Sequence, residues 1–85
     1  MYKILLSNIA KKALDKMPDS VFQRIDKRIQ SLKFEPRPVG CIKLSGNESY
    51  RIRVGDYRII YTINDKIIEI YIFNIAHRKE IYKRK

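Results

Sequence analysis

The chain has 85 residues, of which 45% are hydrophobic, and it carries a formal net charge of +10. This length predicts a single small domain over residues 1–85, and the apolar content is too high for a disordered chain. The excess of Lys and Arg indicates a polyanionic partner: nucleic acid, an acidic protein or an anionic membrane.

Several function classes are disfavoured by what the sequence lacks. The longest apolar run near the N-terminus, Ile4–Leu6, is too short for a signal peptide or a membrane span. The single cysteine, Cys41, excludes an internal disulfide, and both points favour the cytoplasm. One histidine and one cysteine cannot build a four-ligand zinc site. We therefore expect no metal, no cofactor and no membrane partner.

The N-terminal third predicts a strand followed by two helices. Tyr2–Leu6 alternates as a strand does, and Ser7 is placed to cap a helix whose apolar positions recur four residues apart. Pro18 ends that helix, because the residue before a proline avoids helical torsion angles. These apolar positions are Ile9, Ala13 and Met17.

A second helix is predicted by the capping box Ser20–Gln23, and it stops before Glu35-Pro36. Its apolar stripe is Phe22, Ile25, Ile29 and Leu32. The opposite side holds Arg24, Lys27 and Arg28, which are expected to be a solvated face that adds to long-range attraction for a polyanion. A proline- and glycine-containing loop follows, with a brief strand at 42–44.

The segment Tyr50–Phe73 predicts two tight hairpins. It is rich in β-branched and aromatic residues and is broken only at Gly55-Asp56 and Asn64-Asp65, which are typical two-residue hairpin turns. Taken literally, the first turn pairs Arg53 with Arg58 and Tyr50 with Tyr61. The second turn pairs Tyr61 with Ile68 and Arg58 with Tyr71. The expected fold is α+β: a small antiparallel sheet on a helical hairpin, in the order β-α-α-β-β-β, with a short basic C-terminal segment.

Strand alternation sorts these residues to two faces of the sheet. One face is apolar and forms a core. The other, called the arginine face below, collects Arg51, Arg53, Arg58, Ile60, Thr62, Ile67, Glu69, Tyr71 and Phe73. Arg53 directly opposite Arg58 is an unfavourable pair. A surface that accepts this repulsion suits a phosphate, whose oxygens match the guanidinium fork. The alternative is a charged face that only keeps the sheet soluble.

Three blocks of the sequence resemble the RelE/ParE superfamily of bacterial toxins, on its RelE-like (mRNA interferase) side. They are Lys43–Gly46, Tyr50–Tyr61 and the ending His77–Tyr82, in addition to the β-α-α opening. The resemblance implies a toxin of a type II toxin–antitoxin system that enters the ribosomal A site and cuts mRNA, causing growth arrest. It also implies a cognate antitoxin as partner, beside the ribosome and mRNA.

The resemblance implies site residues as well. Arg58 and Arg78 would hold the scissile phosphate, and Tyr82 would stack on or orient a nucleotide. Arg51 and Arg53 stand where many relatives have lysines.

This substitution leaves the proton donor and acceptor open, because arginine does not titrate near neutrality. If the alternation of the last strand continues to residue 77, His77 lies on the arginine face. It is the one histidine in the chain and could donate or accept the proton near neutral pH. Tyr82, Lys43 or ribosomal RNA are the alternatives for proton transfer. Lys43, Tyr71 and Phe73 are candidates for RNA binding, although both aromatic rings also suit packing under the C-terminal segment.

Two other functions fit the same sequence. A ParE-like toxin shares the fold but poisons DNA gyrase without cutting RNA. A non-catalytic RNA-binding module would use the same basic face.

Overall fold

The computed structural model describes residues 1–44 and 48–77. Two helices and five strands follow one another along the chain, and the strands form one sheet in the order β1-β5-β4-β3-β2. The elements are β1 (Lys3–Leu6), α1 (Asn8–Asp15), α2 (Asp19–Ser31), β2 (Ile42–Lys43), β3 (Ser49–Val54), β4 (Tyr57–Asn64) and β5 (Glu69–His77). The predicted α+β class is confirmed, but the sheet is mixed because β1 runs parallel to β5.

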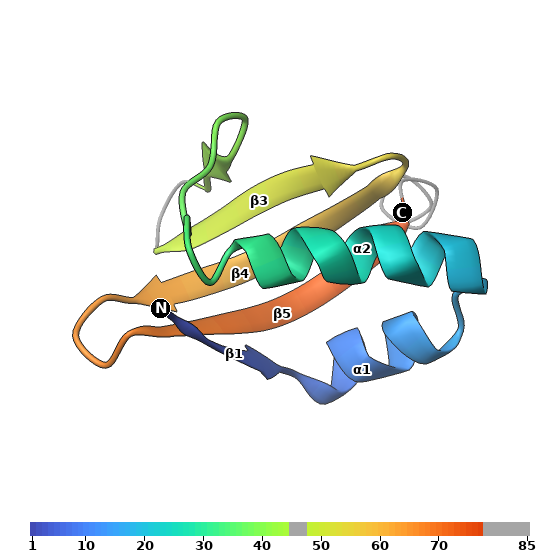
Figure 1. Cartoon of the computed structure of the whole chain (residues 1–85), viewed down its shortest axis with the longest axis horizontal. Helices are drawn as coiled ribbons and strands as arrows, with labels where there is room; N and C mark the ends of the chain where they lie inside the picture. The colour runs from blue at the N-terminus through green and yellow to red at the C-terminus, as the bar shows by residue number, and fades with distance from the viewer. Residues whose placement is uncertain (45–47, 78–85) are drawn as a thin grey trace.

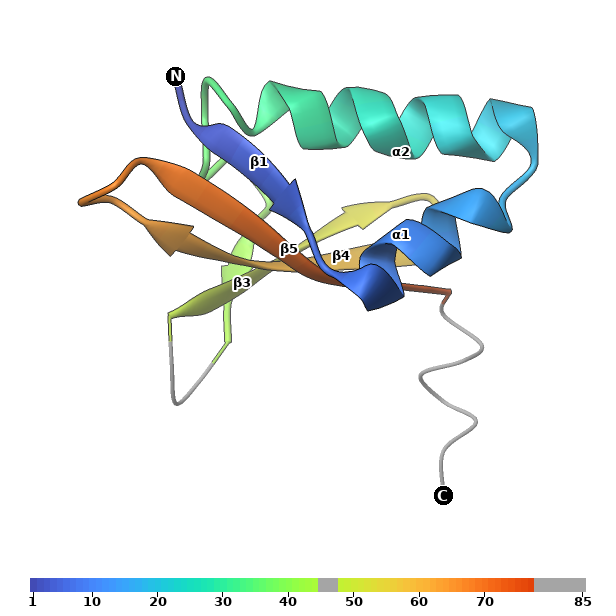
Figure 2. The same ribbon diagram turned by 90° about the horizontal axis from the view of Figure 1, so that it is seen from below.

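Both helices cover the same face of the sheet (Figures 1 and 2). Apolar side chains from both helices, the α2 C-cap and the three long strands form the core between the layers, with Ile25, Leu32, Ile59, Tyr61 and Ile70 fully buried. Neither described helix packs against the other face of the sheet (Figure 2). That uncovered face is the arginine face.

The helix starts follow local hydrogen bonding. Ser7 caps α1 as predicted, because its Oγ accepts from the backbone N–H of Ala10 at 3.0 Å. The fully buried residues of α1 are Ala10 and Leu14. Of the predicted stripe, Ala13 and Met17 are partly buried against the core, whereas Ile9 is 60% exposed. Helix α2 begins directly after Pro18 without a side-chain cap, so the predicted capping box at Ser20 is wrong.

The first hairpin has the predicted register. Arg53 pairs with Arg58, and Tyr50 pairs with Tyr61. Gly55 has φ +59°, and it is the one central turn residue with positive φ, as in a type II′ turn with glycine first.

The second hairpin differs from its prediction. Asn64 pairs with Glu69, so four residues, 65–68, form the loop. The Asn64 side-chain oxygen accepts from the backbone N–H groups of Lys66 and Ile67, which favours this wider turn over a two-residue one. As a result Tyr61 faces Ile72 rather than Ile68. Ile67, assigned to the arginine face, and Ile68, assigned to the core, are both exposed in the loop.

A β-bulge at Phe73 changes the parity of β5. Tyr61 pairs with Ile72 but Ile60 pairs with Asn74, so Phe73 is the extra residue. Ser7 donates to both carbonyls there, from its N–H to Ile72 O at 3.0 Å and from its Oγ to Phe73 O at 2.7 Å. The start of α1 thus holds the bulge in place. Beyond it, Ile75 faces the core and Arg58 lies opposite Ala76, not Tyr71.

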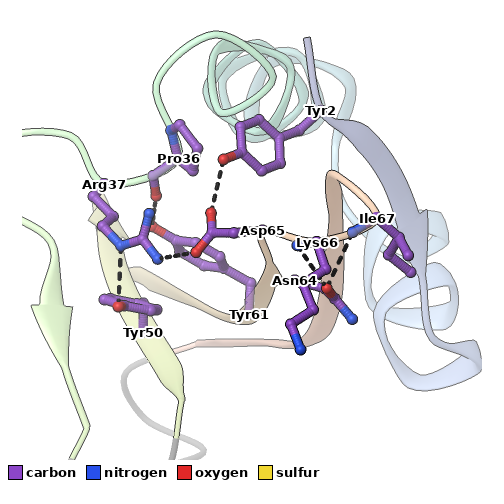
Figure 3. A network of polar contacts seen from close by, with 9 residues as sticks. All are labelled: Tyr2, Pro36, Arg37, Tyr50, Tyr61, Asn64, Asp65, Lys66 and Ile67. Atoms are coloured by element: carbon purple, nitrogen blue, oxygen red, sulfur yellow. Dashed lines mark hydrogen bonds and ion pairs between the residues drawn. The ribbon is translucent and has the colours of Figure 1, made fainter.

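A polar network fixes the end of the sheet that lies away from the Gly55 turn (Figure 3). Arg37 donates to Asp65 at 2.9 Å and to the Tyr50 hydroxyl at 3.1 Å, and the Tyr2 hydroxyl donates to Asp65 at 2.8 Å. Tyr61 donates to Pro36 O at 2.6 Å. The loop after α2, the β4–β5 loop and the N-terminus are therefore tied together.

Candidate functional site

The arginine face is a grid of side chains set by the strand register. One row across the sheet is Arg53, Arg58 and Ala76, and the next is Ile42, Arg51, Ile60 and Asn74. A third row is Ser49, Thr62, Tyr71 and Leu5. The three predicted arginines of β3 and β4 therefore share one face, at the end of the sheet near the Gly55 turn.

Arg53 and Arg58 line a small depression of about 60 Å³ together with Gly55 and Asp56. Such a volume admits a small group of atoms, such as the oxygens of one phosphoryl group. Two guanidinium groups from neighbouring strands at such a spot can bind an anion from two directions. Asp56 is the acidic residue of this depression, and no sequence pattern predicted it there.

Aromatic and apolar side chains occupy the other half of the arginine face. Phe73 is 52% exposed and Tyr71 is 40% exposed, and their ring centroids lie 6.5 Å apart with the planes tilted by 51°. Leu5 lies beside Tyr71 on β1. Exposed rings of this kind can stack on nucleobases. A cationic end and an aromatic end thus lie on one surface.

His77 does not lie on the arginine face, and this predicted placement is wrong. The bulge at Phe73 reverses the parity, so His77 pairs with Tyr57 on the face that the helices cover. The two rings meet edge to face, with centroids 4.9 Å apart and an interplanar angle of 89°. The strand does last as far as His77, but its side chain points away from Arg53 and Arg58.

Three further candidate residues lie elsewhere. Lys43 pairs with Tyr50, so it is on the opposite face of the sheet from Arg51 and Arg53. Arg78 and Tyr82 lie outside the residues that the structure describes. Their proposed roles stay predictions, as do those of the described residues.

The structure adds cations from α2 that the sequence analysis treated as a solvated face. The guanidinium of Arg24 lies against the Gly55 turn: a Cβ atom at Gly55 would be 3.0 Å from Arg24 Nη2. Arg24, Lys27 and Arg28 line a groove together with Arg53. The sequence signal for this was the spacing of these residues along one face of the helix, but α2 can be placed beside β3 only in the folded chain.

The ionised groups near the site are nearly all cationic. The ion pair in which both residues are described is Arg37–Asp65, at the other end of the sheet. There, hydrogen bonds from Arg37 and then Tyr2 lower the pKa of Asp65. Burial raises the pKa of the Tyr61 hydroxyl above its ordinary value, so it stays protonated as a donor. No group of three metal-ligating side chains occurs in the described part of the chain.

This fold and site define a class: a small basic α+β domain with an arginine-rich sheet face that neither described helix covers. The family model described as "ParE toxin of type II toxin-antitoxin system, parDE" matches residues 4–82. The chain belongs to this ParE/RelE family of toxins. Neither described helix has the length and apolar character that a membrane span requires.

Individual relatives agree with this assignment. The chain is 29% identical over 87 residues to Toxin RelG of Mycobacterium tuberculosis, covering 98% of both proteins. It superposes on the toxin of the RelE–RelB complex from Pyrococcus horikoshii with a TM-score of 0.82 and 34% identity, covering 91% of this chain and 94% of that one. For the RelB–RelE complex of Methanococcus jannaschii the TM-score is 0.76 at 28% identity, with 95% and 98% covered.

Proposed function

We propose that this toxin is a ribosome-dependent, metal-independent endoribonuclease that cuts mRNA in the A site. The observation that supports this most directly is the cross-strand pair of Arg53 and Arg58 at a small depression on the uncovered sheet face. Arg51 on the same face and the exposed Tyr71 and Phe73 add a cation and two stacking surfaces. Relatives that are similar over nearly the whole chain carry RelE and RelG names.

Metal-free cleavage requires only the RNA and groups that move protons. The 2′-oxygen attacks the adjacent phosphorus as the bond from phosphorus to the 5′-oxygen breaks, which leaves a 2′,3′-cyclic phosphate and a 5′-hydroxyl. A base takes the 2′ proton and an acid protonates the leaving oxygen. Extra negative charge develops on the phosphoryl oxygens, and cations aimed at them stabilise it. In this proposal Arg53, Arg58 and Arg78 supply those cations.

The described residues include few groups that could transfer protons in this reaction. Arginine does not exchange protons near neutral pH, and His77 lies on the opposite face of the sheet. Lys43 also lies on that opposite face, so Asp56 at the depression and Tyr82 are the remaining protein groups. This scarcity supports a requirement for ribosomal RNA to complete the site, and hence for action in the cytoplasm on translating ribosomes.

A cognate antitoxin is the second part of the proposal. The RelE proteins of P. horikoshii and M. jannaschii are complexed with RelB antitoxins. An antitoxin with an acidic toxin-binding part would suit the +10 charge of this chain.

The experiment is a cleavage assay with purified toxin, mRNA and translating ribosomes. Cleavage should occur on ribosomes, should be slow or absent on free RNA, and should survive a chelator at a level that leaves ribosomes intact. Arg78→Ala should abolish it. Equal rates on free RNA would contradict the ribosome requirement.

The matching family model is described as a ParE toxin, and ParE-like toxins are expected to poison DNA gyrase, so a gyrase inhibitor is the second candidate. A supercoiling assay with purified DNA gyrase distinguishes the two. Inhibition of gyrase without any RNA cleavage would replace the nuclease proposal.

A further inference from the structure

The cationic surface does not end at the edge of the arginine face. Arg53 lines the depression on that face, and it also lines a second, larger groove of about 390 Å³ between α2 and β3. We call this second site the α2 groove. Its lining residues are Arg24, Lys27, Arg28, Ser31, Arg53 and Val54.

The groove exists because the outer edge of β3 is only partly covered. Strand β2 pairs with Tyr50 and Arg51 alone, so among the described residues no strand pairs with the stretch from Ile52 to Val54 on that side. Helix α2 lies beside it on the helix-covered face (Figure 1). The long side chain of Arg53 lies at this edge and reaches both sites.

The ionisable side chains that line the groove are all cationic. Four of its six lining residues are Lys or Arg and none is acidic. Within the described part of the chain, no ion pair involves Arg24, Lys27, Arg28 or Arg53. Three of these cations follow the i, i+3, i+4 spacing that places them together on one face of α2, an arrangement of like charges that destabilises an isolated helix.

Glycine at position 55 connects the groove to the depression. Without a side chain there, the Arg24 guanidinium can lie against the β3–β4 turn, where a Cβ would stand 3.0 Å from its Nη2. Gly55 itself lines the depression with Arg53 and Arg58. The cations therefore form one track, from Arg58 through Arg53 and Arg24 to Arg28.

We infer that the α2 groove binds the phosphate backbone of single-stranded RNA next to the phosphate held at Arg53 and Arg58. Apart from the aliphatic stems of the cations, Val54 is its one apolar lining residue, so the groove has no pocket for a large apolar anchor of an acidic polypeptide. Successive residues one helical turn apart, such as Arg24 and Arg28, suit repeating charges along a chain. The identification of the polyanion as RNA rests on the proposed function, whereas the groove and its charge do not.

The test compares two variants with the same loss of charge. The first replaces Arg24, Lys27 and Arg28 by Gln. The second replaces Lys11 and Lys12 of α1, and Lys16 at its C-terminal cap, by Gln. The probe is a fluorescent 2′-O-methyl oligouridylate of about 12 nucleotides, which spans a typical single-strand site and has no free 2′-hydroxyl to attack. Fluorescence anisotropy gives its affinity for the purified proteins at several salt concentrations.

The α2 variant should bind the oligonucleotide on the order of 10–100-fold more weakly than the wild type near 0.1 M salt. Its log–log salt slope should fall by about 2, since each lost phosphate contact removes roughly 0.7 from the slope. The α1 variant should stay within about two-fold of the wild type. Equal losses in both variants, or none in the α2 variant, would overturn the inference.

Poly-glutamate serves as the acidic-polypeptide probe. If the α2 variant loses affinity for poly-glutamate and for RNA by the same factor, the groove is a site for acidic protein and the inference fails. Circular dichroism checks folding, and the double variant Lys27→Gln/Arg28→Gln, which spares the contact of Arg24 with Gly55, replaces the triple variant if that one unfolds. If RNA binding depends on the groove but the protein never cleaves mRNA, the groove is an RNA-binding site and the proposed nuclease activity is wrong.

Discussion

Arg53 and Arg58 are direct cross-strand partners, one residue from each end of the Gly55-Asp56 turn, on the sheet face that no described helix covers. Like charges in this position repel, so the pair opposes folding while it prepares a site for an anion. Replacing either arginine should therefore raise the stability of the fold and lower its activity.

Arg53→Thr should raise the free energy of unfolding by about 0.2–1 kcal/mol, because it removes the repulsion and threonine suits a strand. The gain should shrink at high salt, which screens exposed charges. Denaturant unfolding at two salt concentrations measures this. Arg51→Thr is the matched control, since Arg51 faces Ile60 and should give no such gain. A loss of stability in Arg53→Thr would show that the pair is not repulsive in the folded protein.

Arg58→Ala should lower single-turnover cleavage on ribosomes by about 10²–10³-fold, the usual effect of removing one oxyanion contact. Lys3→Ala is the control: Lys3 lies on the arginine face at its opposite end, beside Glu69. It removes the same charge and should change the rate little. Full activity of a folded Arg58→Ala protein would exclude Arg58 from the phosphate site.

His77→Gln should keep cleavage within a few-fold of the wild type and leave the pH–rate profile unchanged, because His77 packs against Tyr57 away from the arginines. His77→Ala should instead lower stability by about 0.5–1.5 kcal/mol through loss of the edge-to-face contact. A general acid or base contributes roughly 10²–10⁴-fold. If His77→Gln lowered the cleavage rate by that factor and removed an inflection from the pH–rate profile, His77 would be a catalytic residue after all.

The Arg37–Asp65 network predicts a pH-dependent contribution to stability. The pKa of Asp65 is below its ordinary value of 3.8 in the folded chain, through its hydrogen bonds from Arg37 and Tyr2. The folded state thus favours the carboxylate, so the stabilisation is present at neutral pH and is lost as the pH falls through the folded pKa. Asp65→Asn should therefore destabilise the protein at pH 7. At a pH far below 3.8 the same substitution should destabilise it much less.

Chemical denaturation across this pH range measures the difference between wild type and Asp65→Asn. Asp15→Asn, at the exposed end of α1, controls for general charge effects. A destabilisation that stays constant with pH would show that the Asp65 carboxylate is not the group involved.

Gly55→Ala should destabilise the fold by about 1–2 kcal/mol, since alanine is disfavoured at φ +59°. The added Cβ should also displace Arg24. Gly40→Ala is the comparison, because Gly40 has positive φ but nothing within 4 Å of a Cβ. When Arg24 is also replaced by Gln, the loss of stability caused by Gly55→Ala should fall to the loss caused by Gly40→Ala. No change in that background would mean that Arg24 does not pack on the turn.

The sequence by itself determined the α+β class, the register of the first hairpin and the gathering of Arg51, Arg53 and Arg58 on one face. These follow from local rules: a two-residue turn with glycine sets the pairing, and a period of two sorts side chains to faces. The family resemblance, carried by the block around these arginines and by the chain's ending, also needed no structure.

Tertiary structure decided what depends on contacts between distant segments. Ser7 of the first helix donates to the carbonyls at Phe73, and the bulge held there turns His77 to the face opposite that predicted by strand parity. The side chain of Asn64 widened the second turn to four residues. Arg24 and Arg28 join the arginines of the sheet only because α2 packs beside the uncovered edge of β3. Alternation along one strand carries no information about an inserted residue or a neighbouring helix, since packing partners remote in sequence fix both.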